Sequence, residues 1–167
     1  MHTLAKFVIA VLLCLSFLGW AGVRIKERIT FEQNVEGHLK RASDANTINL
    51  AEKELAGAIA YLEKIGMTSG YTSVLWKTPD EDIGFWYQNL KASLEELHMV
   101  PKEATQLEKS NILIKLRETL VDHGEGGVEV TAPHGASIFP NNTMYFWWGV
   151  IGLVFFIGGV IIFLDIF

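Results

Sequence analysis

The sequence predicts an all-α protein in which two transmembrane helices flank a small membrane-proximal bundle of three or four helices. Three observations lead to this prediction. Residues 144–164 form an uninterrupted apolar stretch, and residues 7–23 form another near the N-terminus. Between them, the chain carries most of its charge and repeats its apolar residues at helical spacing.

The C-terminal apolar stretch is the clearest signal in the chain. No charged residue interrupts it before Asp165. A bilayer core needs about 20 apolar residues in a helix, and lipid cannot hydrogen-bond to a bare backbone. We therefore expect a transmembrane helix over residues 144–164.

Residues 1–23 are expected to form an N-terminal transmembrane anchor. A short positive stub ending at Lys6 precedes the apolar run, a pattern shared by signal peptides and uncleaved anchors. Gly19 and Ala21 suit a signal peptidase, but the run continues without proline and favours an uncleaved anchor. Cys14 is the only cysteine, which excludes a disulfide within the chain and a cysteine-ligated zinc site.

Both termini are expected in the cytoplasm, with the central domain outside the cell membrane. A positive N-terminal stub ordinarily stays in the cytoplasm. Arg24, Lys26 and Arg28 at the far end of the anchor oppose this orientation. However, a connection of about 120 residues crosses largely regardless of its charge.

The central region is acidic. The chain has 14 Lys and Arg against 19 Asp and Glu; only Lys6 and Asp165 lie outside residues 24–143, which leaves 13 against 18. A nucleic-acid surface needs positive charge to displace counterions. We therefore expect no nucleic-acid partner.

A helical bundle is expected over residues 24–123, beginning with two apolar stripes. The first stripe continues the N-terminal helix out of the membrane. The second has Asn46 or Thr47 as its cap and Gly66 as its stop. A single long rod through both stripes remains an alternative. The stripes comprise Ile25, Ile29, Val35, Leu39 and Ala42, then Ile48, Ala51, Leu55, Ala58, Leu62 and Ile65.

A third helix is expected to begin at a capping box, with Thr78 as the N-cap, Pro79 in the first turn and Glu81 closing the box. It ends near Pro101. Its apolar stripe is Ile83, Trp86, Leu90, Leu94 and Leu97.

A last outer helix is expected over residues 102–122, with Gly124 as its stop. It carries two apolar faces, which predicts packing against two neighbours. One face contains Leu107, Ile114 and Val121. The other contains Leu113, Leu116 and Leu120. Residues 124–143 are rich in glycine and proline and are interpreted as an extended tether, with one short strand over residues 128–131.

The candidate interaction surface contains Phe85, Trp86, Tyr87 and Arg117. Trp86 belongs to the apolar stripe, whereas Phe85 and Tyr87 do not, and they flank Gly84, where another backbone can approach. Arg117 lies between the two apolar faces of the last helix. For the aromatic residues the alternative is ordinary core packing. For Arg117 the alternatives are a snorkelling side chain, a salt bridge to Glu or Asp, or an anion contact.

Four glycines in the C-terminal span are predicted to serve membrane helix packing, because small residues let helices approach closely. The partner is the first span, another copy of the chain or a different membrane protein. These glycines are Gly149, Gly152, Gly158 and Gly159.

No catalytic residue, cofactor or metal site is expected. The chain has no zinc-protease motif, phosphate loop or nucleophile elbow. His123, Glu125 and His134 are interpreted as solvated loop residues, and a hydrolase using either histidine is the least favoured hypothesis.

The favoured function is that of a non-enzymatic structural or accessory membrane protein, which associates with itself or with a larger membrane complex. The alternative is an extracytoplasmic ligand-binding module acting through a partner subunit. In layout alone, the chain resembles the sensor domains of bacterial receptors, which also lie between two spans.

Overall fold

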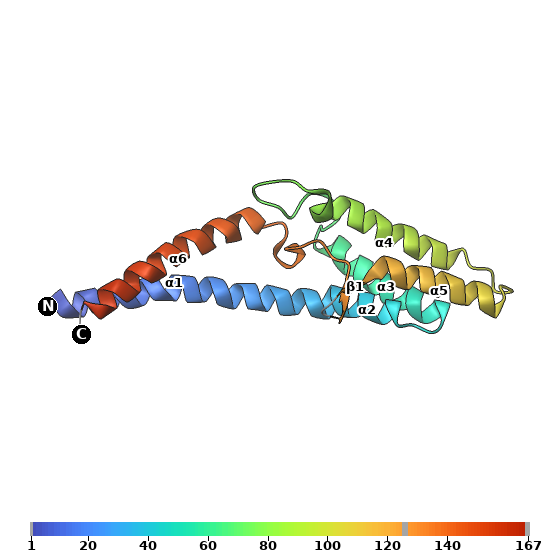
Figure 1. Cartoon of the computed structure of the whole chain (residues 1–167), viewed down its shortest axis with the longest axis horizontal. Coiled ribbons are helices and arrows are strands. Elements are labelled where there is room, and N and C mark those ends of the chain that lie inside the picture. The colour runs from blue at the N-terminus through green and yellow to red at the C-terminus, as the bar shows by residue number, and fades with distance from the viewer. Residues whose placement is uncertain (1, 125–126, 166–167) are drawn as a thin grey trace. The chain divides into compact units, whose positions relative to one another are not determined.

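The computed structural model describes residues 2–124 and 127–165 and is mostly helical (Figure 1). The chain divides into two compact units. We call Met1–Ile29 with Asn141–Phe167 the helix pair, and Thr30–Pro140 the helical domain. The elements are α1 (His2–Phe31), η1 (Glu32–Glu36), α2 (Gly37–Ser43), α3 (Ile48–Lys64), η2 (Pro79–Glu81), α4 (Ile83–His98), α5 (Gln106–Leu120), β1 (Val121–Gly124), β2 (Gly127–Val130), η3 (Ala136–Ile138) and α6 (Asn142–Leu164).

In the helix pair, α1 and α6 run antiparallel and pack against each other. At one end, Lys6 Nζ lies 2.7 Å from Asp165 Oδ2. Toward the other, Trp20 Nε1 donates a 2.7 Å hydrogen bond to the carbonyl oxygen of Tyr145. The prediction of two long apolar helices at the ends of the chain is confirmed.

The first helix continues beyond the apolar segment, as its stripe predicts, but it contains an unexpected π-helical turn. The backbone N–H of Gly37 donates to the carbonyl of Glu32, five residues earlier. A Cβ on Gly37 would lie 3.0 Å from that oxygen, so glycine suits the wide turn.

The core of the helical domain lies among α2, α3, α4 and α5 (Figure 1). The apolar stripes of α2, α3 and α4 form the centre of this core, in agreement with the helical spacing of their apolar residues. Burying each large aliphatic side chain contributes about 1.5–3 kcal/mol. The fully buried members include Leu39, Leu55, Leu62, Ile83 and Leu90.

The two ends of α3 agree with the sequence. Thr47 Oγ1 accepts a hydrogen bond from the backbone of Leu50, and Gly66 after the last turn has a φ of +72°. A positive φ there favours glycine. The turn at residues 44–47 separates α2 from α3, so the alternative of one long rod is wrong.

The predicted start of the third helix was wrong by one turn. Pro79–Glu81 form a 3-10 turn, and Thr78 donates its side-chain hydrogen bond to the Glu81 carboxylate rather than capping the backbone. Asp82 is the N-cap of α4, since its Oδ1 accepts from Phe85 N at 3.0 Å. The cause is a non-local pairing of Asp82 with Tyr71, which holds Asp82 in an extended conformation.

The last outer helix is shorter than predicted. It begins after a capping box made by Thr105 and Glu108, and it ends at Leu120, where the chain enters an antiparallel hairpin of β1 and β2. Its face with Leu116 and Leu120 is buried. The other face is only partly covered: Leu107 and Ile114 are 71% and 54% exposed, whereas Val121, at the start of β1, is buried.

The glycine- and proline-rich return segment is packed against the helical domain. Thr131 donates hydrogen bonds from its backbone N–H to Leu120 O and from its hydroxyl to Thr119 O. Ala136 is buried in the core. The segment that reaches Pro140 is therefore anchored by its own contacts, a feature that its composition did not reveal.

Candidate functional site

A groove of about 730 Å³ lies in the helical domain beside the start of α4. Two parts of the chain that are distant in sequence form its walls. This volume falls within the range of small-molecule sites. The lining residues are Tyr71, Lys77, Thr78, Pro79, Asp80, Asp82, Phe85, Trp86, Asn89 and Leu90 from one part, and Thr119, Asp122, Thr131, Ala132 and Pro133 from the other.

Backbone pairing fixes the first wall of the groove. Tyr71 and Asp82 form an isolated antiparallel bridge. The N–H of Thr72 donates to Glu81 O, and the N–H of Ile83 donates to Gly70 O. These bonds attach the connector after α3 to the first residues of α4, and they place the Tyr71 ring beside the Asp82 carboxylate.

The electrostatics of this wall centre on Tyr71. The negative charge of Asp82 is the main reason why the pKa of the Tyr71 hydroxyl is raised. Lys77 Nζ lies 5.2 Å from the centroid of the Tyr71 ring, within the range of a cation–π interaction. The wall thus holds an ammonium group over an aromatic face.

Phe85 and Trp86 of the candidate interaction surface both line this groove. Phe85 is 66% exposed. Trp86 is only 7% exposed, and its Nε1 has no hydrogen-bond partner in the described part of the chain. Phe85 therefore supplies the accessible apolar surface, and Trp86 forms part of the floor.

Tyr87 lies away from the groove, and the expectation that it stands outside the core was wrong. It is buried between α4 and α3, and its hydroxyl donates a hydrogen bond to Glu63 Oε1. Burial, together with this bond, raises the pKa of Tyr87 to about 12. The side of α4 next to the predicted stripe is covered because α3 packs against it.

Arg117 is also separate from the groove. Its Nε donates a 3.0 Å hydrogen bond to Ser43 O, and one Nη lies 3.9 Å from Asp44 Oδ1. The first contact satisfies a carbonyl at the C-terminus of α2, where a cation is favoured by the helix dipole. Of the alternatives that the sequence left open, the salt bridge matches these contacts.

Three of the four glycines face α1. A Cβ on Gly149 would lie 2.9 Å from the Trp20 ring, and one on Gly152 would lie 3.5 Å from Phe17. On Gly159 it would lie 2.9 Å from both Ala10 O and Cys14 Sγ. Gly158 has nothing within 4 Å of the corresponding position. In this structure, Gly149, Gly152 and Gly159 therefore contact α1 of the same chain.

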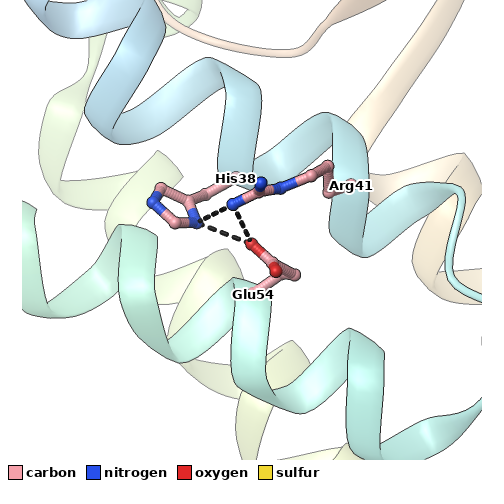
Figure 2. A network of polar contacts seen from close by, with 3 residues as sticks. All are labelled: His38, Arg41 and Glu54. Carbon is pink, nitrogen blue, oxygen red and sulfur yellow. Dashed lines mark hydrogen bonds and ion pairs between the residues drawn. The ribbon is translucent and has the colours of Figure 1, made fainter.

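Sequence reasoning missed a polar network between α2 and α3, which Figure 2 shows. Glu54 Oε2 lies 2.7 Å from His38 Nδ1 and 2.7 Å from an Arg41 Nη. That Nη also lies 3.1 Å from His38 Nδ1, which cannot donate to Glu54 and accept from Arg41 at once. The carboxylate contact is shorter and carries full charge, so we assign the Nδ1 proton to it.

Metal binding finds no support in the described residues, where no group of three His, Cys, Asp or Glu side chains is placed to hold an ion. Glu125 and the side chain of His123 lie outside the described residues. His134 is exposed. Among the described residues, the aromatic and carboxylate groups of the groove are suited to the reversible binding of a ligand.

The comparisons with known proteins provide no relative. No protein-family model, curated protein or solved structure matches this chain. The function proposed below is therefore argued from the residues and their geometry.

Proposed function

We propose that this chain is a two-span membrane protein whose helical domain associates with a partner and catalyses no reaction. The apolar surface of the helix pair supports the membrane location. Only 6% of the most apolar window of the first long helix, and 17% of that of α6, is buried. Lipid is the solvent that accommodates so much uncovered apolar surface.

The proposed orientation places both termini in the cytoplasm and the helical domain outside. Aromatic groups gather where α6 begins: Trp148 stacks on Tyr145, whose carbonyl accepts the Trp20 hydrogen bond. Trp and Tyr are enriched where a membrane meets water. The positive stub at Lys6 then marks the cytoplasmic end. Reporter fusions at Thr30 and at the C-terminus, read on both sides of the membrane, test this orientation.

The exposed Phe85 ring carries the proposal of association. Large aromatic side chains that are left in water beside a groove are typical of protein contact sites. The partner is a second copy or a larger membrane complex. The glycine face of α6 already contacts α1, so we assign the partner surface to the groove rather than to Gly149, Gly152 and Gly159.

Replacing Phe85 by alanine should release the partner while leaving the fold intact, because the ring is mostly exposed. Blue-native electrophoresis of native membranes in mild detergent should show the natural chain in a large species and the F85A variant in a smaller one. M99A is the matched control, since Met99 is 74% exposed at the other end of α4. A natural chain that migrates as a monomer would contradict the proposal.

The volume of the groove favours a second candidate, a ligand-binding module that acts through a partner subunit. A groove of about 730 Å³ with aromatic walls and a few carboxylates can hold a small molecule. Thermal shift of the full chain in lipid nanodiscs, against a panel of small metabolites, tests this candidate. The absence of any shift would reject it.

A further inference from the structure

The connector (residues 65–78), which joins α3 to η2, carries apolar side chains that the helical domain leaves in water. Trp76 is 76% exposed, the largest exposed fraction of any large apolar side chain in the described part of the chain, and its neighbour Leu75 is 58% exposed. Figure 1 shows the connector, in green, as a loop that extends past the start of α4. Single exposed apolar residues are ordinary on a protein surface, whereas adjacent large ones on a projecting loop favour a contact site.

The base of this loop is held in place, so that only its tip projects. The N–H of Thr72 donates to Glu81 O, and Lys77 Nζ lies 5.2 Å from the centroid of the Tyr71 ring. Residues 72–76 therefore begin and end at the same part of the domain. Because the base is already ordered, less conformational entropy is lost when the tip binds.

Covalent geometry places the connector near the start of the C-terminal span. The Phe139 ring packs against Gly70, since a Cβ added to Gly70 would lie 3.2 Å from Phe139 Cζ. Only Pro140 and Asn141 separate Phe139 from Asn142, the first residue of α6. Three residues of chain span at most about 11 Å, so Phe139 stays within that distance of α6. The connector is therefore close to the point where the chain enters the proposed bilayer.

The charge of the connector also suits a lipid surface. Although the domain is acidic, residues 64–79 contain two lysines and no carboxylate. Of the carboxylates that follow, Glu81 accepts from the Thr78 hydroxyl, and Asp82 accepts from Phe85 N. The tip can therefore approach lipid phosphates without bringing a negative charge of its own against them.

We propose that Leu75 and Trp76 insert into the headgroup region of the bilayer that holds the helix pair, and that they attach the helical domain to the membrane in addition to its two spans. Trp side chains are enriched in this region, because the indole ring is apolar and its N–H donates to polar headgroup atoms. The Leu75 side chain adds apolar surface that leaves water on insertion. This inference goes beyond association with a protein partner, and it rests on the proposed membrane location.

Electron paramagnetic resonance of the full chain in nanodiscs, with one chain in each disc, tests the proposal through collisions of a nitroxide label. The label on the L75C variant, in a C14S background, should collide with oxygen, which concentrates in lipid, and should be shielded from a water-soluble nickel chelate. L12C, an exposed position in the apolar part of α1, is the reference for lipid. M99C is the reference for water, because Met99 is exposed and the 16 residues of α4, about 24 Å, separate it from the connector.

Removal of the indole provides a second test. W76S, added to the labelled L75C chain, should restore collisions with nickel, because the loop then loses its larger apolar group. The Trp76 ring is mostly exposed, so the variant should keep its fold. L107S is the matched control, since it removes an exposed apolar side chain at the start of α5 and should leave the label shielded. Equal shielding in W76S and L107S would overturn the proposal.

The outcomes distinguish lipid from the other occupants of this surface. Shielding of the Leu75 label from both oxygen and nickel would show burial against protein and would reject the lipid contact. Nickel collisions equal to those of M99C would show a loop in water and would also reject it. In either case, lipid-like collisions at L12C would leave the proposed membrane location standing, whereas nickel collisions at L12C would contradict that location itself. Loss of the large species in the F85A variant depends on none of these results.

Discussion

Replacing Gly159 by leucine should weaken the pairing of α1 with α6 by about 1–3 kcal/mol, the usual cost of overpacking a close contact. A Cβ at this position would lie 2.9 Å from Ala10 O, which belongs to the backbone and cannot rotate away. The two helices must therefore separate or shift. Small residues at such contacts are what permits close packing of helices in lipid.

Gly158 provides the matched control, because nothing lies within 4 Å of a Cβ there. Nitroxide labels on cysteines at Leu4 and Leu164, two exposed positions near the Lys6–Asp165 contact, report the separation in a C14S background. Pulsed electron paramagnetic resonance should give one short distance for the natural pair and for G158L. G159L should give a longer or broader distribution, and an unchanged one would contradict the packing described for α6.

Replacing Glu54 by glutamine should destabilise the helical domain by about 1–2 kcal/mol near neutral pH. This is the lower part of the range for hydrogen bonds to charged groups, because the Arg41 side chain is 63% exposed and solvent screens its charge. The Glu54 carboxylate is 18% exposed and accepts from both His38 and Arg41. Glutamine keeps the shape but loses the charge that both partners face. Urea unfolding of the full chain in micelles, followed by circular dichroism, measures the difference.

The difference in unfolding free energy between the natural chain and the E54Q variant should also depend on pH in a defined direction. The hydrogen bond from His38, helped by Arg41, lowers the pKa of Glu54 below its ordinary value of 4.5. A carboxyl group whose pKa is lowered by folding contributes stability that is fully present when the pH is above its pKa in the unfolded chain. That stability is lost as the pH falls through its pKa in the folded chain. The natural chain should therefore lose its advantage over E54Q below pH 4.5.

Glu52 is the control for this second prediction, because it lies on the same helix and contacts another histidine. Its Oε1 lies 3.2 Å from His98 Nε2, and the side chains of this pair are more exposed than those of Glu54 and His38. E52Q should change the unfolding free energy by less than about 0.5 kcal/mol. Equal effects of E52Q and E54Q would show that the network between α2 and α3 has no special role.

Local patterns allowed much of the helical architecture to be predicted. Leu55 and Leu62 follow a helical period, and Thr47 and Gly66 have the chemistry of caps. The capping box of Thr105 and Glu108 is equally visible in the sequence and was overlooked. Each of these features depends on residues within a few positions of one another.

The features that were missed depend on contacts between distant residues. Asp82 rather than Thr78 caps α4 because Asp82 pairs with Tyr71. The helical spacing of the apolar residues in α4 does not reveal that pairing. Glu54 meets His38 only at the relative register that α2 and α3 adopt. One wall of the groove includes Asp122 of β1, a segment that sequence reasoning had assigned to a helix end.

The central claim is that both ends of the chain lie in a lipid bilayer, and alkaline extraction tests it most directly. Native membranes that contain the full chain are washed with strongly alkaline carbonate and sedimented. The account predicts that the chain stays in the membrane pellet, together with a known integral protein. Recovery of the intact chain in the supernatant, with peripheral proteins, would contradict it.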